Sequence, residues 1–114
     1  MKTVLFIDES ESHRFLLQEE LSDAGYEVLT ANEVEEALLK WRDFTPDLII
    51  LELRQKSLKK EALQALKKQY PNIPWIGYST FVQCPEEYKQ WINFYIQKSP
   101  EVNGLRNLIR SMER

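Results

Sequence analysis

The fold of this chain can be read from one stretch, Pro46-Asp47-Leu48-Ile49-Ile50-Leu51-Glu52. Four consecutive apolar residues run directly into a carboxylate, and polar residues follow soon after it. A short, uninterrupted apolar run between turn signals predicts a strand buried on both faces, as in a parallel sheet. An acid at the carboxyl end of such a strand lies in the crevice where open α/β sheets place their binding sites. Glu52 is therefore the first candidate site residue.

Similar apolar runs predict four more strands, at residues 4–7, 26–30, 73–78 and 94–97. A helical pattern follows each of the five strands. We expect Ser10 or Ser12 to cap the first helix, Asn32 to cap the second, Pro85 to open a short fourth, and Ser99-Pro100 to open the last. The apolar residues at helical spacing fall into five groups, one for each helix in chain order. They are Phe15, Leu16, Leu17, Leu21 and Ala24; Val34, Ala37, Leu38 and Trp41; Leu58, Ala62, Leu63, Ala65 and Leu66; Tyr88 and Trp91; and Val102, Leu105, Leu108, Ile109 and Met112.

Strands that alternate with helices predict an α/β fold: a doubly wound, five-stranded parallel sheet with helices on both faces and right-handed crossovers. We expect the strand order 2-1-3-4-5, with the topological switch point between the first and third strands. Residues 1–114 are expected to form a single stand-alone domain without an output domain.

The composition favours a globular protein of a reducing compartment. Hydrophobic residues make up 43% of the chain and charged residues 29%, and the only cysteine, Cys84, excludes an intrachain disulfide. The apolar run before Asp8 is too short for a signal peptide, and no segment has membrane-spanning length, so we expect a cytoplasmic protein without membrane contact. The net charge is −8 over residues 1–54 and +5 over residues 55–114. We interpret this asymmetry as solvated helix faces and not as a nucleic-acid site.

Polar residues that can carry chemistry follow four of the predicted strands. Because the carboxyl ends of parallel strands meet at one sheet edge, these residues are expected to share a crevice. Clustered carboxylates can hold a hard cation such as Mg²⁺, a hydroxyl can donate to a phosphoryl oxygen, and a lysine can neutralise the charge of that group. The residues are Asp8 and Glu9 after the first strand, Glu52 after the third, Ser79 and Thr80 after the fourth, and Lys98 after the fifth.

The order and spacing of these residues resembles the receiver domain of bacterial two-component response regulators, over essentially the whole chain. The segments that carry the resemblance are Ile7-Asp8-Glu9, residues 46–52, residues 74–80 and Tyr95-Ile96-Gln97-Lys98. It implies the flavodoxin-like receiver fold and a signalling role without enzymatic activity of its own.

The resemblance also implies a role for each matching residue. Asp8 and Glu9 would be the acids of a metal site, and Glu52 occupies the position of the phospho-acceptor and could serve as a third, weak Mg²⁺ ligand. Ser79 would be the hydroxyl that reports phosphorylation, and Lys98 the phosphate-binding lysine. Tyr95 would be the aromatic residue whose ring moves with phosphorylation.

The sequence departs from the family pattern at several points. Glu52 replaces the acceptor Asp, and the loop at residues 53–60 lacks the usual Pro and Gly. Lys98 is followed by Ser99-Pro100 and not directly by Pro, and the short interval from Ser79 to Lys98 predicts a truncated fourth helix.

A glutamate at the acceptor position changes the expected chemistry. Its extra methylene would displace an acyl phosphate by more than about an ångström, which can cost roughly a hundredfold in rate. We expect Glu52 to pair with Lys98, and we hypothesise a receiver-like module that needs no phosphorylation and no cofactor, with weak Mg²⁺ binding still open.

Three other functions stay open at this point. The chain could be a working phospho-receiver that accepts phosphate at Glu52, or its charged residues could form a structural ion-pair network without a function of their own. It could also be a small flavodoxin-like enzyme or nucleotide-binding domain. Against the last, the chain has no Gly-rich phosphate loop, since its three glycines are Gly25, Gly77 and Gly104.

The expected partner is a protein, either a sensor kinase or a downstream signalling protein. The resemblance implies contact, and potentially homodimerisation, through the fourth helix, the fifth strand and the last helix. Tyr88, Trp91 and Tyr95 belong to this face, and the sequence leaves open whether they are core or interface residues. His13, the only histidine, is interpreted as a partly exposed surface residue near the acid pair, and Cys84 as a packing residue.

Overall fold

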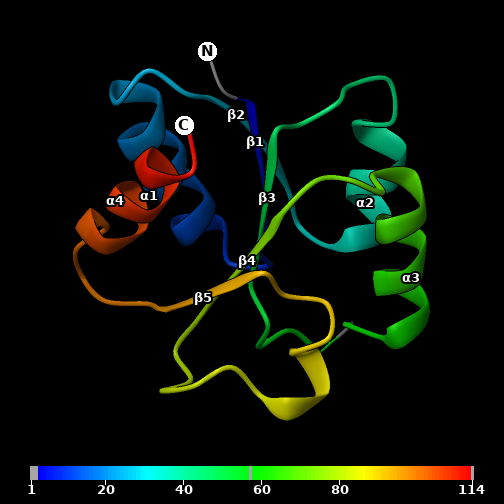
Figure 1. The fold of residues 1–114 in the computed structure, drawn as a ribbon. Helices are drawn as coiled ribbons and strands as arrows, with labels where there is room; N and C mark the ends of the chain where they lie inside the picture. The colour runs from blue at the N-terminus through cyan, green and yellow to red at the C-terminus, as the bar shows by residue number, and fades with distance from the viewer. Residues whose placement is uncertain (1–2, 57, 114) are drawn as a thin grey trace.

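Five parallel strands form one sheet in the order β2-β1-β3-β4-β5. The structure, a computed structural model, describes residues 3–56 and 58–113. Helices α1 and α4 cover one face of the sheet, and α2 and α3 cover the other (Figure 1). The predicted doubly wound fold and its strand order are confirmed. In chain order the elements are β1 (Thr3–Ile7), α1 (Glu11–Asp23), β2 (Glu27–Ala31), α2 (Val34–Lys40), β3 (Leu48–Leu51), α3 (Lys60–Gln69), β4 (Trp75–Ser79), the 3₁₀ turn η1 (Glu86–Tyr88), β5 (Phe94–Gln97) and α4 (Asn103–Ser111).

The central strand β3 is apolar throughout because helices cover both of its faces. Leu48 and Ile50 pack into the core beneath α1 and α4, whereas Ile49 and Leu51 pack into the core beneath α2 and α3. Successive side chains of a strand point to opposite faces, so a strand covered on both sides needs an apolar residue at every position. All four residues are buried, which places Glu52 at the first position beyond the apolar layers.

The predicted fourth helix is reduced to a single 3₁₀ turn. Pro85 precedes η1, and the backbone N–H of Tyr88 donates to the Pro85 carbonyl over three residues. Trp91, which we expected in this helix, lies beyond the turn. The truncation that the short interval from Ser79 to Lys98 predicted is therefore confirmed, and it goes further than a shortened helix.

Two predicted helix starts are wrong because local side chains bond elsewhere. The backbone N–H of Asn32 donates to Glu36, and Glu33 occupies the N-cap position of α2 without a side-chain bond. The Ser99 hydroxyl donates to the Glu101 carbonyl instead of capping a helix, and α4 begins only at Asn103. The first helix does begin as predicted, with Ser10 as its cap.

The apolar face predicted for α1 is only half buried. Leu17 and Leu21 enter the core, whereas Phe15 is 62% exposed and Leu16 is 46% exposed. Ala24 is also exposed and forms the C-cap, followed by Gly25 with a φ of 96°, a conformation that favours glycine. The helix therefore presents two large apolar residues to solvent.

Gly77 lets the Tyr95 ring approach the β4 backbone. A Cβ at Gly77 would lie 3.1 Å from a side-chain carbon of Leu53, 3.1 Å from a ring carbon of Tyr95 and 3.3 Å from Ile92. We predict that Gly77→Ala destabilises the fold by about 1–3 kcal/mol, because these three buried or partly buried neighbours cannot all move away. Urea unfolding followed by circular dichroism measures the change.

Gly104 supplies the matched control for this prediction. It lies in the first turn of α4, and a Cβ there would meet only a carbon of Ile96 at an ordinary 3.8 Å. Gly104→Ala is expected to stabilise the protein by about 0.4–1 kcal/mol, since alanine restricts the unfolded chain and suits a helix. Equal effects of the two substitutions would contradict the steric explanation.

Candidate functional site

The carboxyl ends of β1, β3 and β5 bring Asp8, Glu52 and Lys98 together. Ile7 and Leu51 are register partners on the neighbouring strands β1 and β3, so the acids that follow them lie side by side. Lys98 comes from β5 and crosses the end of β4, where its ammonium lies 5.4 Å from the centre of the Tyr78 ring. The long lysine side chain can reach across β4, which separates β5 from the strands that precede Asp8 and Glu52.

The Lys98 ammonium bridges the two carboxylates. Its Nζ donates to Asp8 Oδ2 at 2.7 Å and to Glu52 Oε1 at 2.7 Å. The side chains of Lys98, Asp8 and Glu52 are only 10%, 2% and 8% exposed. Charge-assisted bonds of this length in a desolvated setting fix all three groups. The predicted pairing of Glu52 with Lys98 is confirmed.

The two remaining carboxylate oxygens are also bonded. The backbone N–H of Ser10 donates to Asp8 Oδ1 at 2.9 Å, and the backbone N–H of Arg54 donates to Glu52 Oε2 at 2.8 Å. Each oxygen of both acids therefore has a donor at hydrogen-bond distance. One donor on each oxygen of Glu52 leaves a lone pair free, but these bonds fix the orientation of the carboxylate and lower its nucleophilicity.

His13 contacts the site, although sequence reasoning treated it as a surface residue. Its side chain is 51% exposed, yet Nδ1 lies 3.0 Å from Lys98 Nζ and 3.6 Å from Asp8 Oδ2. An ammonium group has no acceptor, so His13 Nδ1 must be the acceptor in this bond, and the ring proton belongs on Nε2. The signal was present in the sequence: His13 lies three residues after the helix cap Ser10, at the end of α1 that faces the strand ends.

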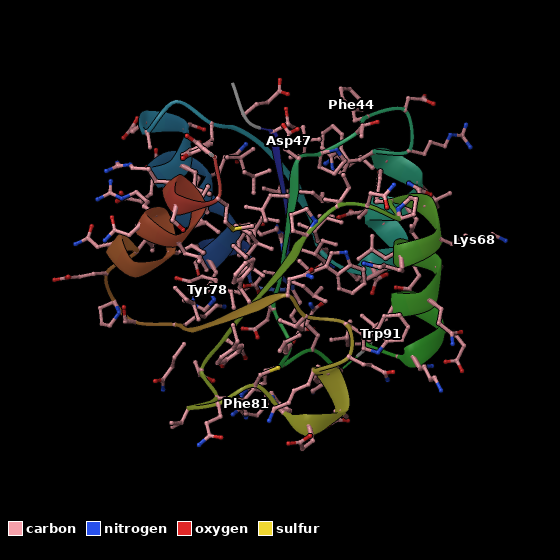
Figure 2. All side chains as sticks on the ribbon, in the orientation of Figure 1. Phe44, Asp47, Lys68, Tyr78, Phe81 and Trp91 are labelled. Carbon is pink, nitrogen blue, oxygen red and sulfur yellow. The ribbon has the colours of Figure 1, made fainter. Side chains whose placement is uncertain are left out.

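Arg54 is a site residue that sequence reasoning missed. Beyond its backbone bond to Glu52, its Nε donates to Thr80 Oγ1 at 3.0 Å, and its guanidinium lies 4.2 Å from the centre of the Phe81 ring. Figure 2 shows Phe81 on the loop that follows β4. The arginine thus ties the loop after β3 to the loop after β4, beside the buried Glu52 carboxylate. We had noted only that its loop lacks Pro and Gly.

The three predicted metal-site acids do not come together. Glu9 is exposed, whereas Asp8 and Glu52 are buried against Lys98. Over residues 3–56 and 58–113, no group of three or more His, Cys, Asp or Glu side chains is arranged to hold a metal ion. An ammonium, and not a third acid, neighbours the buried pair, and weak Mg²⁺ binding by Asp8, Glu9 and Glu52 stays a prediction. Because Lys98 already contacts both carboxylates, a Mg²⁺ ion bound there would share their oxygens with the ammonium.

The predicted switch residues Ser79 and Tyr95 are held close together. Ser79 is fully buried, and its Oγ has no hydrogen-bond partner. The Tyr95 hydroxyl donates to the backbone carbonyls of Ser79, at 3.2 Å, and Phe81. Burial and the nearby Glu52 charge raise the pKa of Tyr95, which keeps the hydroxyl protonated as the donor.

Tyr88 and Trp91 pack against the core on the α2 and α3 side. Both are partly buried, and the Trp91 ring stacks on the fully buried Trp75 with centroids 6.1 Å apart. Figure 2 shows Trp91 on the side of the sheet that faces α3. The structure therefore gives these aromatics a packing role, and their prediction as interface residues stays a prediction.

Comparison with known proteins identifies relatives over nearly the whole chain. The family model of the response regulator receiver domain matches residues 4–110. The response regulator TrrA of Thermotoga maritima, solved in complex with Mg²⁺ and BeF, superposes with a TM-score of 0.80 at 27% identity, covering 98% of this chain and 99% of that one. The chemotaxis protein CheY4 of Vibrio cholerae superposes with a TM-score of 0.83 at 28% identity, covering 97% and 98%. TrrA has also been solved in complex with the histidine kinase ThkA.

The curated relatives are longer than this chain. The alkaline phosphatase synthesis transcriptional regulatory protein PhoP of Bacillus subtilis is 41% identical over 74 residues, which are 64% of this chain and 31% of PhoP. The matched segment thus spans about a third of that relative, and whether residues 1–114 act alone stays a prediction. Among the described residues, no helix has the length and apolar character needed to cross a bilayer.

Proposed function

The chain belongs to the response regulator receiver domains of two-component systems, and on this basis we propose that it signals by protein contact without phosphorylation of Glu52. Receiver domains are signalling modules, and the chain has the fold and the strand-end residues of one. In this chain the contacts of Glu52 would take the place of phosphorylation.

One observation carries the proposal: the acceptor-position carboxylate is already bonded at both oxygens. Glu52 is 6% exposed, Lys98 neutralises Oε1, and the Arg54 backbone holds Oε2. The ion pair and the backbone hydrogen bond stabilise the anion, lower its nucleophilicity and hold it in one orientation. The ground state of the acid is therefore stabilised against reaction.

Through the same bonds, Glu52 makes the contact with Lys98 that a phosphoryl group would otherwise make. The carboxylate reaches Lys98 across the sheet edge and supplies about one negative charge, compared with roughly −1.5 to −2 for a phosphoryl group. Tyr95 meanwhile bonds two backbone carbonyls on the β4 side. These contacts support a single, permanently held arrangement of the residues that the family uses as a switch.

The partner is expected to be a sensor kinase or a downstream signalling protein, bound at the face of η1, β5 and α4. Strand β5 forms one edge of the described sheet, and Phe94 on it is 43% exposed. Tyr88, Trp91 and Tyr95 pack on the α2 and α3 side of the sheet, whereas Phe94 points to the side covered by α1 and α4. An exposed aromatic on an edge strand suits a protein interface.

Beryllofluoride, a mimic of a bound phosphoryl group, tests the proposal directly. With Mg²⁺ and beryllofluoride, the amide resonances of Ser79, Thr80 and Lys98 are expected to stay unchanged in the native chain, because the Glu52 carboxylate and the Lys98 ammonium hold each other in place. NMR titration measures the shifts, and Glu52→Asp serves as the variant expected to respond. A saturable shift in the native chain that Glu52→Gln removes would overturn the proposal.

A further inference from the structure

A cavity of about 340 Å³ opens beside the site, between α1 and the segment that leads into α4. Figure 2 shows Tyr78 on the side of the sheet that α1 and α4 cover. Most of the cavity wall is apolar, and Lys98 lines it together with polar side chains. The lining residues are Leu16, Leu17, Pro100 and Val102, with Tyr78, and His13, Thr80, Lys98 and Ser99. A volume of this size accommodates a small ligand.

The cavity carries no uncommitted charge. Lys98 is its only lysine, arginine or acid, and its ammonium donates to Asp8, Glu52 and His13 Nδ1. An ammonium group has three donors, so all of them are engaged. An anionic ligand would have to displace one of these partners, and a cationic ligand would meet Lys98 itself. Burying an unpaired charge in a mostly apolar cavity is costly in either case.

Three of the remaining polar groups can donate a hydrogen bond, whereas the Ser99 hydroxyl already donates to the Glu101 carbonyl. His13 Nδ1 accepts from Lys98, so the ring N–H is at Nε2. Thr80 Oγ1 accepts from Arg54 Nε at 3.0 Å and keeps its own proton to donate. Burial, with the charges of Asp8 and Glu52, raises the pKa of Tyr78, so its hydroxyl also stays protonated. The cavity thus pairs an apolar wall with neutral donors.

We propose that this cavity binds an uncharged small molecule with an apolar body and a carbonyl oxygen. The carbonyl accepts from His13 Nε2–H and the Thr80 hydroxyl, and the apolar body packs against Leu16 and Val102. Such a ligand contacts the residues around Lys98 without disturbing its bonds to Asp8 and Glu52. The inference does not depend on whether Glu52 can be phosphorylated.

Three probes of nearly equal size and different charge test the ligand class: benzamide, benzoate and benzylamine. In NMR titrations, benzamide is expected to give saturable shifts of the Leu16, Leu17 and Val102 methyl resonances. Its affinity should exceed that of either charged probe by about tenfold or more. Absence of saturable shifts with benzamide, or equal binding of benzoate or benzylamine, would overturn the proposal.

Matched variants locate the site. Leu16→Glu places a charge on the cavity wall and is expected to abolish benzamide binding, and because Leu16 is 46% exposed the fold should tolerate the substitution. Leu39→Glu, at a 73% exposed position on α2 away from the cavity, should bind as the native chain does. His13→Phe keeps a ring but removes the donor and should weaken binding about two- to tenfold. Equal losses in Leu16→Glu and Leu39→Glu, or no loss in His13→Phe, would contradict the assigned site.

Discussion

Lys98→Met is expected to destabilise the protein by about 3–5 kcal/mol, because it leaves two buried carboxylates without a countercharge. Asp8 and Glu52 have side chains only 2% and 8% exposed, and both bond to Lys98 Nζ at 2.7 Å. Methionine keeps the length of the apolar part of the lysine side chain. The loss of stability therefore measures the effect of removing the charge and not the effect of creating a cavity. Urea unfolding at neutral pH gives the change in the free energy of unfolding.

An exposed ion pair provides the control for this measurement. Lys89 and Glu86 are bonded at 2.8 Å, but their side chains are 52% and 88% exposed. Lys89→Met should therefore change stability by less than about 1 kcal/mol. Adding Glu52→Gln to Lys98→Met removes one of the unpaired charges and should recover part of the loss. A Lys98→Met effect as small as that of Lys89→Met would show that the central ion pair does not stabilise the site.

Glu52→Asp is expected to gain phosphorylation, at a rate about a hundredfold above that of the native chain. Shortening the side chain by one methylene withdraws the carboxylate by roughly 1.5 Å from Lys98, which frees the ammonium and leaves room for a phosphoryl group. The resemblance to receiver domains places Asp at this position. Incubation with acetyl phosphate and Mg²⁺, followed by intact-mass measurement over time, gives the rates.

Two variants separate acceptor chemistry from incidental labelling. Glu52→Gln should not be labelled, because an amide oxygen is a poor nucleophile. Asp47→Asn alters an acid at the opposite end of β3, where Asp47 accepts from the Thr3 backbone, and should behave as the native chain does. If Glu52→Asp folds but gains no label, then the length of the Glu52 side chain is not what prevents phosphorylation.

The layered fold could be predicted because it follows from local apolar patterns. The run from Leu48 to Leu51 has no polar residue, and only a strand covered on both faces suits such a run. The joint placement of Asp8, Glu52 and Lys98 followed from strand order, since parallel strands share one carboxyl edge. The Glu52–Lys98 pair could be predicted because the extra methylene of glutamate carries its carboxylate towards the place of a phosphoryl group, where the lysine lies.

Other features depend on where individual side chains point, which no pattern in one sequence specifies. Glu9 and Asp8 are neighbours along the chain, yet Glu9 is exposed, whereas Asp8 is buried and accepts hydrogen bonds from the Ser10 backbone and from Lys98. The contact between His13 and Lys98 needs the rotation of α1 relative to the sheet. Arg54 joins two loops whose approach is a tertiary property, and the late start of α4 depends on one hydroxyl bond of Ser99.

We propose that this receiver domain keeps Glu52 bonded to Lys98 and unphosphorylated. The most direct test is the intact mass of the native chain after prolonged incubation with acetyl phosphate and Mg²⁺, with Glu52→Asp treated in parallel to show that the donor is active. We predict an unchanged mass for the native chain. A gain of one phosphoryl group that is lost on mild base treatment, and that Glu52→Gln abolishes, would contradict the account.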